Sequence, residues 1–151
     1  MRRLRDGDWI AGAGGVVLLA AMFADWYAPD AVFGAPGGNA WQAFSVLDAV
    51  LALLALVPLA LVALQATRDS PSLPVAFSVL TTVAGALATL LMLYRIVNQP
   101  GPNDAVTVEL GAWIGLVAAV AIAGGGWRSM RVEAMPGVPQ PPVEDLPAPA
   151  P

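Results

Sequence analysis

The sequence of 151 residues contains no cysteine and no histidine, and only 12% of its residues are charged. The first two absences exclude disulfides, thiol nucleophiles, zinc sites and acid–base chemistry by imidazole. The charged fraction is far below the roughly 25% of a soluble domain, and 58% of the residues are hydrophobic. This composition excludes a soluble enzyme, a nucleic-acid-binding protein and a disordered regulator. It predicts an integral membrane protein without enzymatic activity, cofactor or metal.

Four long apolar segments account for most of the hydrophobic residues. They run over residues 9–26, 44–66, 74–97 and 106–127, each close to the ~20 residues with which a helix crosses a ~30 Å hydrocarbon core. The connections between them are short, so successive helices must be antiparallel neighbours. Residues 1–131 are therefore predicted to form an all-α membrane protein domain, an up-down-up-down four-helix transmembrane bundle without β-strands.

The first segment has an alternative interpretation as a secretory signal, because three arginines precede a short apolar run. However, Asp6 and Asp8 dilute this positive region, and the tripeptide directly before Asp25, residues 22–24 (MFA), is not an A-x-A cleavage pattern. Trp9 and Trp26 at the two ends of the segment are typical of anchors at a membrane–water interface. We therefore interpret the segment as a retained transmembrane helix.

The positions of the arginines predict the orientation in the membrane. All seven basic residues are arginines, and with a cytoplasmic N-terminus only Arg95 lies outside. The opposite orientation would invert this bias, which the positive-inside rule disfavours. We expect a multi-pass protein of the cell (plasma) membrane with both termini cytoplasmic. The inner arginines are then Arg2, Arg3, Arg5, Arg68, Arg128 and Arg131.

The last part of the chain, residues 132–151, differs in composition from the apolar segments. It holds seven prolines, several acidic residues and no basic residue. Such a segment cannot bury a hydrophobic core, so a disordered cytoplasmic tail with polyproline II character is predicted. A Pro-rich tail can also dock on a partner, although a solvated tail is the simpler interpretation.

Small residues at four-residue spacing indicate where helices pack closely. Gly111, Gly115, Ala119 and Ala123 form one stripe on the fourth segment, and Gly85 lies in a similar stripe on the third. The first segment offers a further group of small residues near its cytoplasmic end: Ala11, Gly12, Gly14 and Gly15. Because lipid does not drive helices together hydrophobically, such stripes let backbones approach one another in membranes. The packing could occur within one chain or between chains, and we favour packing within one chain.

Three ionisable residues lie near the outer ends of the segments: Asp48, Arg95 and Glu109. Counted from the inner turn near Ser70, Asp48 and Arg95 lie at depths that agree within ~5 Å. We therefore predict a partly buried ion pair of Asp48 and Arg95, structural or functional, with a snorkelling Arg95 as the alternative. Glu109 is predicted to be an interfacial acid.

Two classes of function remain open. The first is a structural or regulatory membrane component that associates with the lipid bilayer and, through helix packing, with other membrane proteins or with copies of itself. The second is a small-solute transporter or channel subunit with an outward-facing site at Asp48 and Arg95. The mid-bilayer polar side chains are too few for a water-filled pathway, which favours the first class. They all lie in the third segment: Ser78, Thr81, Thr82 and Thr89.

The segments at residues 41–48 (WQAFSVLD), 78–82 (SVLTT) and 124–128 (GGGWR) are similar to those of one group of membrane proteins. The sequence resembles small, uncharacterised four-span integral membrane proteins of high-GC actinobacteria. The resemblance extends over most of residues 1–131. It implies a four-span fold and carries no assigned activity.

Overall fold

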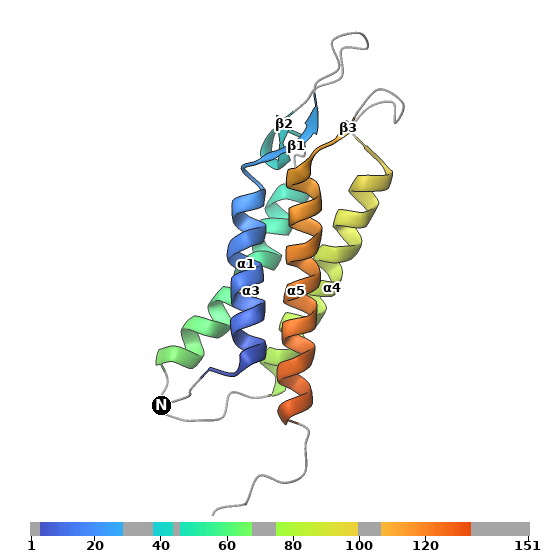
Figure 1. Ribbon diagram of the computed structural model, residues 1–151. Coiled ribbons are helices and arrows are strands. Elements are labelled where there is room, and N and C mark those ends of the chain that lie inside the picture. Colours follow the sequence, from blue (N-terminus) through green and yellow to red (C-terminus); the bar gives the residue numbers. More distant parts are fainter. Residues whose placement is uncertain (1–3, 29–37, 44–45, 68–74, 100–106, 134–151) are drawn as a thin grey trace, which may run out of the picture.

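The computed structural model of the chain describes residues 4–28, 38–43, 46–67, 75–99 and 107–133. Most of these residues are helical, and four long helices lie side by side (Figure 1). Helix α1 packs against α3 and α5, and α4 packs against the same two helices. The bounds of the long helices are α1 (Asp6–Ala21), α3 (Leu47–Thr67), α4 (Val75–Val97) and α5 (Leu110–Glu133).

Three stretches of these helices are long and apolar enough to cross a membrane: Leu47–Thr67, Phe77–Val97 and Leu110–Val132. Their outward side chains are large and apolar, with Leu90 63% and Val117 69% exposed. Helices α3 and α4 cover the second and third predicted segments almost end to end. Helix α5 continues to Glu133, beyond the predicted end of the fourth segment, whereas the predicted tail after it lies outside the described residues.

Helix α1 is shorter than predicted, because it ends at Ala21 and not at residue 26. The indole N–H of Trp26 donates a hydrogen bond of 2.6 Å to the carbonyl of Ala21, so a side chain satisfies one of the last helix carbonyls. Trp26 and Tyr27 are 0% and 1% exposed, which corrects the expectation that Trp26 is an interface anchor. Burial of this aromatic pair takes the chain out of the helix.

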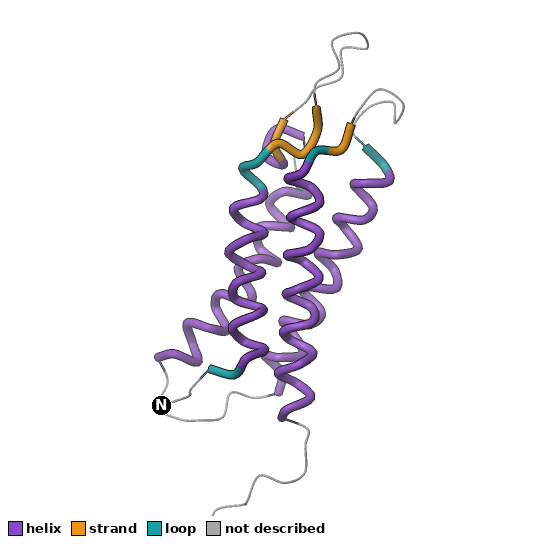
Figure 2. Tube along the Cα trace, in the orientation of Figure 1, coloured by secondary structure: helices purple, strands orange, loops and turns teal. Residues whose placement is uncertain are grey.

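A small antiparallel sheet closes one end of the helices (Figure 2). Its central strand is β1 (Asp25–Ala28), flanked by β2 (Gly38–Asn39) and β3 (Thr107–Val108). Tyr27 pairs with Val108, so the segments after α1 and before α5 are joined. The prediction of a domain without strands is therefore wrong, because strands of two to four residues from separate connections leave no periodic pattern. Strand β3 also occupies the predicted start of the fourth segment.

A short helix, α2 (Ala40–Ala43), follows β2 and lies beside the sheet. The side chain of Asn39 accepts the backbone N–H of Gln42 at 3.1 Å, and the Gln42 side chain accepts the N–H of Asn39 at 3.4 Å. This reciprocal pair is a capping box that starts the helix. The N–H of Ala40 donates to the carbonyl of Met22 at 3.2 Å and fixes α2 on the end of α1.

Helix α3 contains Pro58, which is buried against α1. Proline has no N–H and removes one hydrogen bond from the helix ladder, which bends helices at this point. The second half of α3 leans away from the other helices in Figure 1. For orientation, we call the end with the sheet the strand end, and the opposite end, where α1 begins and α5 ends, the terminal end.

Candidate functional site

Helices α4 and α5 approach each other at the level of Gly85. A β-carbon on Gly85 would come within 2.6 Å of the Ala123 Cα, so only glycine allows this backbone contact. One turn further along α5, Gly126 lies against the backbone N–H and the hydroxyl of Thr82. Small residues therefore set the distance between these two helices.

The other members of the small-residue stripe on α5 also contact residues of the same chain. Gly115 faces the end of the Met92 side chain on α4, Gly111 faces the carbonyl of Asp25 in β1, and Ala119 is fully buried. The stripe thus lies between α4 on one side and α1 with β1 on the other.

The contact between α1 and α5 depends on glycines outside the predicted stripe. A β-carbon on Gly125 would lie 2.6 Å from the Ala11 nitrogen, and one on Gly14 would lie 2.9 Å from the Ala118 carbonyl oxygen. Gly7 lies directly against Ser129. Ala11 and Gly14 belong to the predicted group of small residues on the first segment, whereas Gly7 and Gly125 were not predicted. The four-residue spacing of Gly7 and Ala11 in the sequence was the signal that could have indicated Gly7.

A buried carboxylate closes the terminal end of the α1–α5 interface. Asp8 is 1% exposed, and its Oδ1 accepts a hydrogen bond of 2.7 Å from the Ser129 hydroxyl, 121 residues away in the sequence. Its Oδ2 accepts the backbone N–H of Arg5 at 2.9 Å at the start of α1. One side chain therefore caps α1 and fixes α5 to it.

We expect Asp8→Ala to lower the free energy of unfolding by about 2–4 kcal/mol, because it removes the cap and leaves a buried hydroxyl without its acceptor. Ser129→Ala should cost less, and the double variant less than the sum of the two. Asp6→Asn is the matched control, because Asp6 lies only two residues from Asp8 and its side chain is 80% exposed. Unfolding in detergent measures the cycle, and strict additivity would show that the two side chains act independently.

The acidic residue Asp48 lies in the first turn of α3 and is 6% exposed. Its Oδ1 accepts the backbone N–H of Ala49 at 2.9 Å. The free N–H groups and the dipole at a helix N-terminus stabilise a carboxylate there. Glu109 directly precedes α5, is half-buried, and donates its backbone N–H to the Trp26 carbonyl at 2.8 Å. Both acids therefore lie at helix starts at the strand end.

The predicted ion pair of Asp48 with Arg95 is not formed. Among the side chains that the structure describes, the ion pair found joins Arg128 to Asp6 at 3.6 Å, at the terminal end. Arg95 is half-buried in the last turn of α4, and its backbone carbonyl accepts the hydroxyl of Tyr27 at 3.1 Å. Because the start of α3 already stabilises the Asp48 carboxylate, that group does not depend on the arginine.

The phenol of Tyr27 is a titratable group at the strand end. Burial raises the pKa of Tyr27 above its ordinary value, and the positive charge of Arg95 opposes this rise. The raised pKa means that the folded protein holds the phenol proton more tightly than the unfolded chain does. Stability from this group is therefore complete below about pH 10 and is lost as the pH rises through the folded pKa.

This pH dependence can be measured cleanly, because the chain has no lysine or cysteine and a guanidinium keeps its charge in proteins. We expect the melting temperature in detergent to fall above about pH 10. The fall should disappear in Tyr27→Phe and persist in Tyr94→Phe, whose ring is 56% exposed in the parent protein. An unchanged alkaline fall in Tyr27→Phe would assign it to another group.

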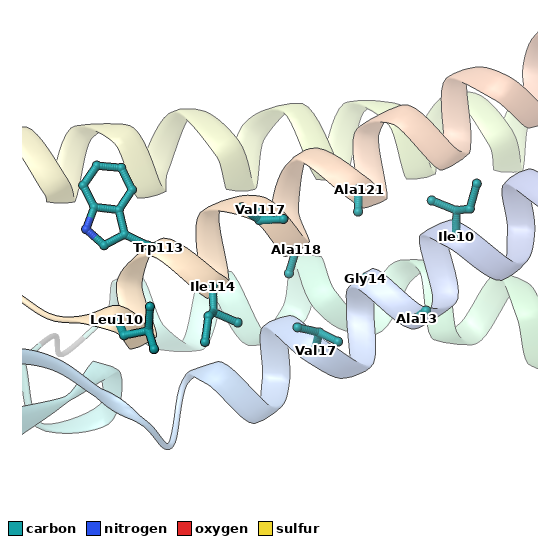
Figure 3. Close-up of a pocket in the computed structure, with 10 residues that line it drawn as sticks. All are labelled: Ile10, Ala13, Gly14, Val17, Leu110, Trp113, Ile114, Val117, Ala118 and Ala121. Atoms are coloured by element: carbon teal, nitrogen blue, oxygen red, sulfur yellow. The ribbon is translucent and has the colours of Figure 1, made fainter.

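A groove of about 560 Å³ runs between α1 and α5 on the outer surface of the helices (Figure 3). Side chains such as Ile10 and Val17 of α1 and Trp113 and Val117 of α5 line it, and they are 42–69% exposed. All ten lining residues are apolar or glycine. The groove is therefore built to receive apolar groups.

A second hollow, of about 240 Å³, lies between the same helices at the terminal end. Its lining is mixed: charged and hydroxyl side chains line one part, and the apolar Leu4 and Val132 line another. The charged and hydroxyl side chains are those of Arg5, Asp6, Arg128 and Ser129. Nearby, the guanidinium of Arg131 lies 5.4 Å from the centre of a tryptophan ring on its own helix. In the part of the chain that the structure describes, no group of acidic residues could hold a metal ion.

No family model matches the chain, and comparisons with curated proteins and with solved structures find no match either. The class of protein therefore follows from the structure. The three long apolar helices indicate a helical, membrane-embedded protein. Its most distinctive features are the groove between α1 and α5, the Asp8–Ser129 contact and the sheet at the strand end.

Proposed function

We propose that this chain is a four-span integral membrane protein whose helices form an up-down-up-down bundle. The supporting observation is the distribution of polar and apolar side chains. Large aliphatic and aromatic side chains are exposed along all four long helices, whereas Asp8, Asp48 and Ser129 are buried. A water-soluble protein buries its large apolar side chains and exposes its charged ones. An apolar surface of this extent is solvated by lipid tails.

Helix α1, although only 16 residues long, supports the count of four spans. It meets α5 at Gly7 and Ser129 near the terminal end, and the chain after α1 meets α5 again where Asp25 contacts Gly111. Gly111 and Ser129 are 18 residues apart, about 27 Å along the helix axis. This segment of the chain therefore extends over nearly the ~30 Å of a hydrocarbon core.

The described arginines support cytoplasmic termini in the cell membrane. Arg5, Arg128 and Arg131 lie at the terminal end, and Arg95 lies at the strand end. The positive-inside rule then places the terminal end in the cytoplasm and the sheet outside.

Single cysteines test this arrangement, because the natural chain has none. We expect an impermeant maleimide to label Asn98→Cys, at the exposed end of α4, on intact cells. Leu4→Cys and Gln140→Cys should react only after permeabilisation. Labelling of Leu4→Cys from outside would show that the N-terminal helix does not cross the membrane as proposed. Labelling of Gln140→Cys from outside would show that the C-terminus is not cytoplasmic.

For the role of the protein, we propose a non-enzymatic structural or regulatory membrane component that acts through its exposed helix faces. The threonine hydroxyls of α4 support this role over transport. Thr81, Thr82 and Thr89 each donate to the carbonyl four residues earlier in their own helix, at 2.8–3.0 Å. Hydroxyls engaged in this way do not form a polar pathway between helices.

Flux measurements distinguish this role from transport. Liposomes that contain the purified protein should retain small ions and polar solutes as well as empty liposomes do. Asp48→Asn liposomes serve as the comparison, since this acid was the candidate for a transport site. A solute flux that the wild-type protein carries and Asp48→Asn abolishes would contradict the proposed role.

A further inference from the structure

We propose that the groove between α1 and α5 binds one anionic glycerophospholipid from the leaflet at the terminal end. The headgroup would occupy the hollow beside Arg5 and Arg128, and one acyl chain would lie in the apolar groove. This inference rests on the proposed membrane function. It goes further by naming a specific lipid class for one face of the protein.

The apolar groove and the hollow at the terminal end lie on the same faces of the two helices. On α1, Ile10 lines the groove and Asp6 lines the hollow, four residues apart. On α5, Ala121 lines the groove and Arg128 lines the hollow, seven residues or two turns apart. Because residues at these spacings share one helix face, the two depressions follow one another along a single track.

On α5, Gly124 lies three residues after Ala121 and four before Arg128, on the same side of the helix as both. It is exposed. No atom lies within 4 Å of the position that its β-carbon would occupy. Gly124 therefore leaves the track open where a larger residue would fill it. Neighbouring glycines on α5 differ in this respect, since Gly125 and Gly126 are closed in by α1 and α4.

The charge at the terminal end fits a phosphate group. Arg5 and Arg128 both line the hollow, and a guanidinium binds phosphate through two parallel hydrogen bonds. The ion pair of Arg128 with Asp6 has a length of 3.6 Å, and its side chains are 61% and 80% exposed, so it is weak. The Arg128 guanidinium can therefore leave Asp6 and bind a phosphate. The carboxylate of Asp6 repels that phosphate, because both groups are negative.

The length of the track fits an acyl chain from one leaflet. Half of a ~30 Å hydrocarbon core is ~15 Å, which corresponds to about ten residues of helix. Ten residues from Arg128 towards the strand end lies Ala118, which lines the groove. An acyl chain that begins beside the hollow would therefore end within the apolar groove.

The experiment is thermal unfolding of the full-length protein in a neutral detergent, titrated with phosphatidylglycerol or with phosphatidylcholine of the same acyl chains. We expect phosphatidylglycerol to raise the melting temperature by about 5 °C at a hundredfold excess over its Kd. Phosphatidylcholine should have much less effect. Arg128→Gln should weaken the phosphatidylglycerol effect about tenfold in concentration. Asp6→Asn should strengthen it.

Two pairs of variants separate the site from general effects. Arg131→Gln makes the same charge change as Arg128→Gln but lies outside the hollow. It should therefore leave the rise in melting temperature with phosphatidylglycerol unchanged. Gly124→Leu should block the track without lowering the stability of the lipid-free protein, because its side chain meets open space. Ala86→Leu, at an exposed position on α4, is its control and should bind phosphatidylglycerol normally.

Equal effects of the two lipids, or equal losses in Arg128→Gln and Arg131→Gln, would overturn the proposal in favour of nonspecific attraction. A lipid-independent disulfide dimer of Val117→Cys would overturn it too, because the groove would then be covered by a second copy. The titration is done in detergent, so its result does not depend on orientation. Failure of the membrane topology would appear only in the cysteine labelling.

Discussion

Replacing Gly85 by alanine is expected to lower the free energy of unfolding by about 3 kcal/mol, at the upper end of the range for overpacking. The added methyl group would meet the Ala123 backbone, which cannot rotate away as a flexible side chain could. Helices α4 and α5 would have to separate along their whole contact. In a chain of this size the change corresponds to a fall of about 6–12 °C in melting temperature.

Gly124→Ala is the matched control on the facing helix. Its β-carbon meets no atom within 4 Å, and alanine favours the helix over glycine by up to about 1 kcal/mol. We therefore expect a neutral or stabilising effect. If both variants had the same melting temperature, the distance between α4 and α5 would not be limited by Gly85.

Trp26→Ala is expected to cost about 3–5 kcal/mol, the range for removing a large buried aromatic side chain. The indole is 0% exposed and lies against Gly111 and Gly115 of α5. Its loss would leave a cavity between the sheet and the helices. It would also leave the Ala21 carbonyl without the indole N–H. Thermal unfolding in detergent measures the effect.

Trp26→Phe separates most of the cavity from the loss of the hydrogen bond, because it keeps a six-membered aromatic ring and removes the N–H donor. We expect it to cost about 1–2 kcal/mol. Trp9→Ala is the control, since Trp9 is 61% exposed and packs little. A loss at Trp9→Ala as large as that at Trp26→Ala would mean that the sheet is not anchored by a buried indole.

The sequence predicted the long apolar helices well, for a simple physical reason. An uninterrupted apolar run of about 20 residues can satisfy its backbone hydrogen bonds in lipid only as a helix. Leu47–Thr67 and Phe77–Val97 therefore match the second and third predicted segments closely. Small residues at four-residue spacing likewise directed attention to Gly85 and Ala123, which lie in contact.

The strand end was not predictable in the same way. Strands β1, β2 and β3 are short, and each forms only because the others are brought beside it by the helices. The burial of Trp26 depends on the open surface that Gly111 and Gly115 leave on α5. An aromatic residue at the end of an apolar run reads equally well as an interface anchor, and nothing local distinguishes the two cases.

The sequence thus determined apolar composition and helix length, because each depends on a continuous stretch of chain. The partners of the charged groups could not be predicted from the sequence. Depth along the helices suggested a pair of Asp48 with Arg95, yet depth does not specify rotation about the helix axis or the effect of a helix N-terminus on a carboxylate. The contact of Asp8 with Ser129 joins residues 121 positions apart, and it exists only because glycines let α1 and α5 approach closely.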